Sequence, residues 1–184
     1  RDERTPLTLT NGVDLQSIPA DKTLVELFEA GELDALTTAR MPSSFIDGKP
    51  NVARLFPDYR AVERAYYEKT GFFPIMHLIG VRKDVAAKYP WLPSSLYKAF
   101  SEAKEIALGE VRDINALNVT LPWVEAEALE TARLMGDDYW RYGVKECAHE
   151  IEALTRYSFE QGLSERRLTA VDLFAPSTFE ISKI

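Results

Sequence analysis

The pattern of apolar and polar positions predicts short strands and helices in alternation over the first part of the chain. Residues 13–18 alternate apolar and polar side chains, which is typical of a strand with one buried face. A helix capped by Asp21 and ended by Gly31 is expected next, followed by a short strand at 33–36. This strand–helix–strand order predicts an α/β layer with a parallel sheet.

The pattern between residues 40 and 81 continues this order. Residues 40–50 are rich in Pro, Ser and Gly and predict a loop at the carboxyl end of a strand, where open α/β sheets usually hold ligands. Residues 51–56 are expected to be extended, and a helix is predicted from Asp58 to Gly71. The run 72–81 is the most apolar and most strand-like segment of the chain.

Helical periodicity dominates the rest of the chain. Ser94 or Ser95 can cap a long helix, and two further helices are expected at 125–135 and 145–161. Residues 169–172 are typical of a capped turn. The predicted fold class is therefore α/β, with a βαβ first half and a mostly helical second half.

Composition limits the class of protein. With 184 residues, 46% of them hydrophobic, the chain is long and apolar enough for one folded domain. The net charge of −7 and the lack of a Lys/Arg run argue against a nucleic-acid partner. The longest apolar stretch, around 75–81, is too short to span a membrane. The chain begins without Met, so we expect its natural N-terminus to be missing.

Familiar catalytic motifs are absent from the sequence. It contains no GxSxG elbow, no phosphate-binding loop, no GxGxxG and no Cys pair. Cys147, the single cysteine, is interpreted as a small helix residue. His149 is expected at the surface, and neither histidine has a second His at ligand spacing. No cofactor and no metal site are predicted, and a metal requirement stays open.

His77 stands out because it interrupts an apolar strand-like run. It is either a core histidine bonded to a backbone carbonyl or a proton donor at a strand end beside a cleft.

Several charged and phenolic side chains are further candidates. Arg40 is either a solvated loop charge or a clamp for a ligand carboxylate. Arg54 lies in an apolar extended segment and must be paired, with Glu63 as one partner, or point at a ligand. Tyr66 and Tyr67 either pack or bind phenolic oxygens through their hydroxyls.

Several separated segments carry a more specific signal than periodicity: 31–36, 39–42, 54–59 with Glu63 and 66–67, 73–77, 89–91, 96–100, 121–123 and 160–163. The first of these resembles the GE-hydrophobic-DA signature of the type II periplasmic-binding-protein fold, and the others resemble the 4,5-dihydroxyphthalate decarboxylase family. The resemblance covers nearly the whole chain. Residues 145–149 depart from it, so no role is transferred to that helix.

The resemblance implies a two-lobed fold with the ligand held between the lobes. Family members are longer, so the chain is expected to be a C-terminal portion and an incomplete two-lobed fold. Residues 1–73 would then be the remainder of the second α/β lobe. Residues 74–184 would be a return strand and C-terminal helices that belong to or pack on the first lobe, with a hinge or boundary near 71–84.

The resemblance also implies the non-oxidative decarboxylation of 4,5-dihydroxyphthalate to 3,4-dihydroxybenzoate. Residue chemistry then suggests which side chains carry out each step. The candidates are His77 and Glu63 for catalysis, and Arg40, Arg54, Tyr66 and Tyr67 for binding a small aromatic carboxylate.

Two other hypotheses accompany the enzyme hypothesis. The same cleft in a solute-binding receptor would deliver a small organic anion to a transporter, because fold alone does not decide function. The enzyme is expected in the cytoplasm and the receptor in the periplasm. Alternatively, residues 1–184 alone are inactive and self-associate, since half a cleft leaves apolar surface uncovered.

Overall fold

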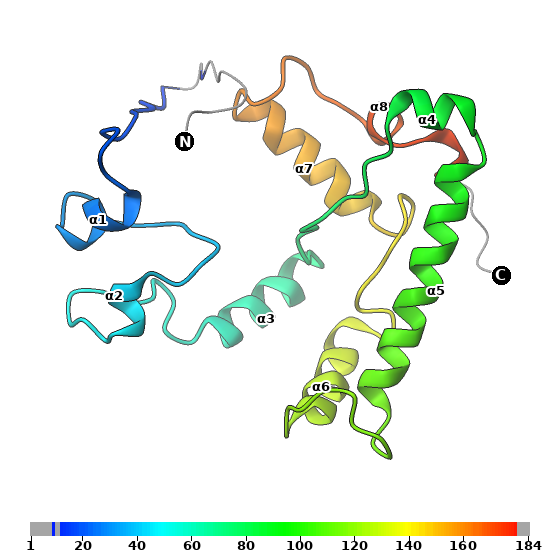
Figure 1. Ribbon diagram of the computed structural model, residues 1–184, viewed down its shortest axis with the longest axis horizontal. Coiled ribbons are helices and arrows are strands. Elements are labelled where there is room, and N and C mark those ends of the chain that lie inside the picture. The colour runs from blue at the N-terminus through cyan, green and yellow to red at the C-terminus, as the bar shows by residue number, and fades with distance from the viewer. Residues whose placement is uncertain (1–8, 10–11, 180–184) are drawn as a thin grey trace. The chain divides into compact units, whose positions relative to one another are not determined.

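The computed structural model describes Leu9 and residues 12–179, and these are organised in helices (Figure 1). The elements are α1 (Leu24–Glu29), α2 (Ser43–Ile46), α3 (Tyr59–Thr70), α4 (Lys83–Lys88), α5 (Leu92–Arg112), α6 (Val124–Met135), α7 (Ala148–Glu160), α8 (Ala170–Leu173) and the 3-10 helix η1 (Pro176–Thr178). None of these described residues forms a β-strand. No helix in the described ranges combines the length and apolar character that a bilayer crossing requires.

The predicted α/β fold, with its βαβ first half and its periplasmic-binding-protein-like architecture, is therefore wrong for the described residues. A strand is stable only where a neighbouring segment takes up its backbone hydrogen bonds. Residues 13–18, 33–36 and 72–81 pair with no other described segment. The alternation in 13–18 also has no buried face, because Val13 and Leu15 are 55% and 60% exposed. Apolar alternation specifies a half-buried strand only when the tertiary fold supplies a partner.

The chain divides into two compact units. One comprises Leu9–Ala65, and the other comprises the described residues from Tyr66 onward. Each is described by itself below. The expected assignment of residues 1–73 and 74–184 to two lobes of a larger fold stays a prediction.

In the unit Leu9–Ala65, local signals set the ends of α1. Thr23 caps this helix in place of the predicted Asp21: its hydroxyl accepts from the Glu26 N–H at 3.2 Å, and its own N–H donates to Glu26 Oε2 at 2.7 Å. This reciprocal pair is a capping box. Gly31, with φ +76°, follows the helix as predicted.

Residues 40–50, which were predicted to form a loop, contain the short helix α2, which begins after Pro42. α3 agrees with its prediction, because Asp58 Oδ1 accepts from the Ala61 N–H at 3.1 Å at the start of the helix. Gly71, with φ +68°, follows its end.

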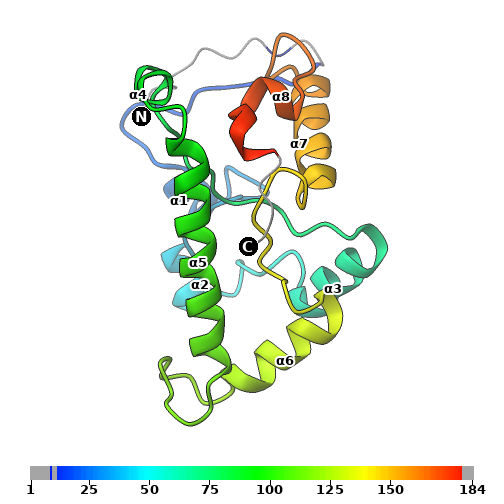
Figure 2. The ribbon, with the colours of Figure 1, turned by 90° about the vertical axis from the view of Figure 1, so that its right-hand side faces the viewer.

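In the other unit, α5 contacts both α6 and η1, and α7 contacts α8 (Figures 1 and 2). Buried Val144, Cys147 and Ile151 form the core at the start of α7. Ile75 of the extended segment 72–81 packs against this core, together with Ala170 of α8, Phe174 and Phe179. The apolar run predicted as a strand thus contributes to burial without pairing as one.

In this unit some helix boundaries agree with the sequence prediction, and others do not. α6 agrees with the predicted 125–135, and Thr169 forms the predicted capped turn, with its N–H donating to Asp172 at 2.8 Å. α7 begins at Ala148 and ends near the predicted position. α5 begins at Leu92, before Ser94, because Pro93 occupies the first turn without needing a backbone donor. The helix α4 was not predicted.

Replacing Gly143 with Ala is expected to lower the free energy of unfolding by about 1–3 kcal/mol, because its φ of +117° strains any residue with a Cβ. The added Cβ would also displace the Glu146 carboxylate, which is the end of a flexible side chain, so the backbone conformation dominates the loss. Thermal unfolding followed by circular dichroism measures the loss. Gly109→Ala is the matched control: inside α5 and with nothing near its Cβ, it is expected to raise the melting temperature. Equal behaviour of the two variants would contradict this account.

Candidate functional site

The loop that carries Arg40 and precedes Arg54 is tied to α1 by one carboxylate. Glu29 Oε1 accepts from the Ser43 hydroxyl at 3.1 Å and from the Ser44 N–H at 3.2 Å. Lys49 Nζ lies 3.6 Å from Glu29 Oε2. Both ends of α2 are therefore held by a residue at the end of α1, so the local fold around α2 depends on this single acid.

Hydrogen bonds from Ser43 and then Ser44 hold the pKa of Glu29 below its ordinary value. A carboxylate with a lowered folded pKa stabilises the fold fully above its unfolded pKa of about 4.3, and this stabilisation is lost as pH falls through the folded pKa. We expect the Ser44 amide resonance to titrate below about pH 4.3 in nuclear magnetic resonance spectra. Glu29→Gln should abolish that titration, whereas a midpoint at or above the ordinary glutamate value would contradict the assignment.

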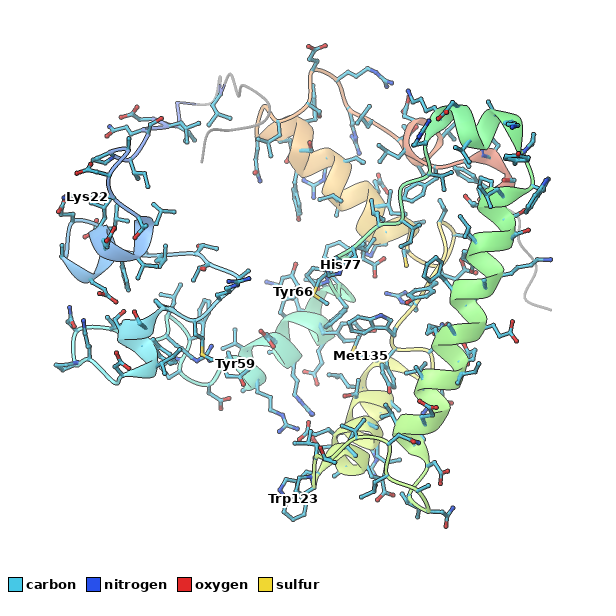
Figure 3. All side chains as sticks on the ribbon, viewed as in Figure 1. Lys22, Tyr59, Tyr66, His77, Trp123 and Met135 are labelled. Atoms are coloured by element: carbon cyan, nitrogen blue, oxygen red, sulfur yellow. The ribbon has the colours of Figure 1, made fainter. Side chains whose placement is uncertain are left out.

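Arg54 lies on aromatic rings, and none of the described acids pairs with it. Its Cζ lies 5.1 Å from the centroid of the Phe45 ring and 4.8 Å from that of the Tyr59 ring. Nη2 lies 3.7 Å from Met41 Sδ. We call Arg54 with Met41, Phe45 and Tyr59 the Arg54 cluster; Figure 3 labels Tyr59 at the start of α3.

The predicted pairing of Arg54 with Glu63 is not found, and no carboxylate in the described part of the chain forms an ion pair with Arg54. The expectation of a buried charge is also wrong, since Arg54 is exposed. Arg40 is exposed as well: its backbone N–H donates to Thr38 Oγ1 at 3.2 Å, and none of the described acids pairs with its guanidinium.

α3 presents three of the candidates at helical spacing. Glu63, Tyr66 and Tyr67 are separated by three and four positions, which places them on neighbouring parts of one helix face. Glu63 and Tyr66 are exposed, and Tyr67 is half-buried. α3 has no buried residue, so the structure leaves this face open to a ligand or a partner.

His77 lies on the extended segment 72–81 and is exposed, so the interpretation as a core histidine is wrong (Figure 3). The first residues of this segment pack against α7 and against the residues that precede α7. The Phe72 ring lies 4.3 Å from the His149 ring, and the Phe73 ring lies 5.5 Å from that of Trp140. These contacts and the partly buried Ile75 set the position of the backbone that carries His77.

The candidate residues are divided between the two units. Arg40, Arg54 and Glu63 belong to Leu9–Ala65, and Tyr66, Tyr67 and His77 belong to the other unit. Their convergence on one substrate therefore stays a prediction.

His149 is at the surface as expected, whereas Cys147, interpreted as a helix residue, lies in the turn directly before α7. Cys147 is buried directly before α7, and burial, then the Glu150 charge, raises the pKa of its thiol. The thiol is therefore protonated at neutral pH, which argues against a nucleophile. Glu150 itself is buried and ion-paired with Arg141. His149 is exposed.

The unit that begins at Tyr66 contains a hollow of about 1000 Å³, which no sequence pattern predicted. Its lining includes Tyr97 of α5, Ile151 of α7 and Phe179 after η1. Two basic residues, Lys145 and Arg167, and two acidic residues, Glu146 and Glu152, line the hollow, so their formal charges cancel. None of the predicted site residues lines it, although Tyr97 belongs to a segment that resembles the decarboxylase family and Thr169 to the predicted capped turn. Elsewhere, the described His, Cys, Asp and Glu residues include no group of three suited to holding a metal ion.

The chain is similar along its whole length to a known enzyme. No family model matches the chain. Over all 184 residues it is 41% identical to the 4,5-dihydroxyphthalate decarboxylase of Comamonas testosteroni, and it spans 56% of that relative's length. This similarity confirms the family resemblance that the separated motifs indicate.

Proposed function

We propose that this chain, as part of a member of the 4,5-dihydroxyphthalate decarboxylase family, contributes to the decarboxylation of a hydroxylated aromatic dicarboxylate, 4,5-dihydroxyphthalate itself. The observation that carries the proposal is the 41% identity, which extends along the entire chain. Since the chain spans 56% of its relative, the activity belongs to the whole protein. A cytoplasmic location accompanies the enzyme function in this proposal.

The substrate can supply its own electron density for this reaction. Each carboxylate of 4,5-dihydroxyphthalate is para to a hydroxyl, so a phenolate raises electron density at the ring carbon that bears the carboxylate. A proton adds to that carbon and a C–H bond forms. The C–C bond to the carboxylate then breaks, its electron pair restores the aromatic ring, and CO₂ leaves. In principle this sequence needs a general acid but no electron-sink cofactor.

Arg40 and Arg54 are the proposed partners of the two adjacent carboxylates. A guanidinium presents N–H donors in a planar fork that matches a carboxylate, so it binds and orients the acid in one contact. The exposure of both side chains and the lack of an acidic partner among the described residues support this role. An arginine already neutralised by an internal acid would bind a substrate anion less well.

His77 is the proposed general acid, with Glu63 as the second candidate. Both side chains are exposed, so a ligand can approach them. Tyr66 or Tyr67 is proposed to bind the catechol hydroxyls, because a phenol both donates and accepts a hydrogen bond.

One assay tests the proposal directly. The full-length protein is incubated with 4,5-dihydroxyphthalate, the release of CO₂ and 3,4-dihydroxybenzoate is followed, and the measurement is repeated with a chelator. Stoichiometric formation of both products supports the proposal, and the chelator shows whether a metal takes part. Tight binding without turnover would overturn it and favour a solute-binding receptor.

A further inference from the structure

Arg54 differs from several other arginines of the chain in the side chains that contact its guanidinium. Several of those arginines are ion-paired with acids close in sequence: Arg82 with Asp84 at 2.5 Å, Arg156 with Glu160 at 3.2 Å and Arg166 with Asp172 at 2.6 Å. Arg54 is held by two rings and a thioether, all of them uncharged. Its positive charge is therefore oriented without being neutralised.

Stacking on rings also leaves the donors of a guanidinium available. The ring electrons attract the flat face of the cation, whereas the N–H groups point outward in the guanidinium plane. In the Arg54 cluster, one of these nitrogens faces Met41 Sδ, a weak acceptor that a carboxylate oxygen can replace. The rings thus orient the Arg54 guanidinium, and its N–H donors stay available to a ligand.

The rings come from two helices that the local fold holds beside Arg54. Phe45 lies in α2, which Glu29 ties to α1, and Tyr59 is the first residue of α3. Because long side chains lose much rotamer freedom when they bind a ligand, an arginine that is already oriented binds a carboxylate more tightly.

We propose that Phe45 and Tyr59 are positioning residues that orient the Arg54 guanidinium for a carboxylate of the aromatic substrate. The inference rests on the proposed function for the identity of the substrate. In this proposal the aromatic rings orient the guanidinium, and the Tyr59 hydroxyl does not.

The test is a set of substitutions in the full-length protein. Phe45→Leu and Tyr59→Leu are each expected to raise KM for 4,5-dihydroxyphthalate by about threefold to tenfold, with little change in kcat, because one exposed ring–cation contact is lost. Tyr59→Phe keeps the ring and should restore most of the affinity. Tyr157→Leu, which removes a ring lying 4.5 Å from the Arg156 guanidinium elsewhere, is the matched control and should leave KM unchanged. Circular dichroism and melting temperatures show whether each variant folds.

A double-mutant comparison separates positioning from general packing. In an Arg54→Gln background, Phe45→Leu and Tyr59→Leu should cause no further rise in KM, since the group that they orient is gone. A further rise of the same size would overturn the proposal, as would a Tyr59→Phe variant no better than Tyr59→Leu.

Direct binding distinguishes failure of this inference from failure of the proposed function. Calorimetric titration with phthalate, a dicarboxylate without the hydroxyls needed for the reaction, measures Kd without turnover. If 4,5-dihydroxyphthalate is not decarboxylated but loss of either ring weakens phthalate binding by about threefold to tenfold, only the proposed function fails. If phthalate does not bind, or binds with a Kd that neither ring affects, the positioning proposal fails.

Discussion

Replacing His77 with Gln is expected to lower kcat for 4,5-dihydroxyphthalate by a factor of about 10²–10⁴, with the fold intact. Gln is similar in size and polar but cannot deliver a proton to the ring carbon, which is the step assigned to the imidazole. Since His77 is exposed on an extended segment, the substitution removes no core packing. Steady-state decarboxylation by the full-length protein, with circular dichroism to verify folding, measures the effect.

His149→Gln is the matched control for this prediction. His149 is also exposed, but its ring lies against Phe72 and no role in the reaction is assigned to it. We expect kcat to stay near the wild-type value, with at most a small loss of stability. Near-normal turnover of a folded His77→Gln protein would remove His77 from the mechanism, and Glu63→Gln would then be the next substitution to measure.

Replacing Arg54 with Gln is expected to lower kcat/KM for 4,5-dihydroxyphthalate by a factor of about 10–100. The variant loses charge-assisted hydrogen bonds to a substrate carboxylate, each worth about 1.5–3 kcal/mol. Arg54→Lys should fall between Gln and wild type, because it keeps the charge but not the planar fork. Initial rates over a range of substrate concentrations separate the effect on KM from that on kcat.

The control for Arg54 is an arginine that is already neutralised. Arg156 pairs with Glu160 one helical turn away in α7, and Arg156→Gln should leave kcat/KM unchanged. If Arg54→Gln behaves like this control, Arg54 is only a solvated surface charge, and the carboxylates must be bound elsewhere.

Helix ends were largely predictable, because their signals lie within a few residues of one another. Asp58 and Gly71 border α3 as expected, and the Thr169 capping box forms within four residues. Where the prediction failed, two residues competed for one role: Thr23 caps α1 in place of Asp21 because it has Glu26 three positions further on.

Strands were not predictable in the same way, because a strand depends on a partner that can be distant in sequence. The apolar run 72–81 was expected in a parallel sheet, but it is extended and pairs with no other described segment, with Ile75 packed on the core near α7. The apolar composition correctly indicated burial at one position, yet it could not specify whether another segment would supply the backbone hydrogen bonds.

By itself the sequence determined the family resemblance, the ends of α3 and α6, and the candidate residues whose chemistry suits a doubly charged aromatic acid. The tertiary structure alone decided that His77 is exposed and that the charge of Arg54 lies on the Phe45 and Tyr59 rings with no acidic partner among the described residues. Residue types and short spacings are properties of the chain and can be recognised directly. Exposure and ring–cation contacts depend on how α2 and α3 fold around Arg54, which no local pattern specifies.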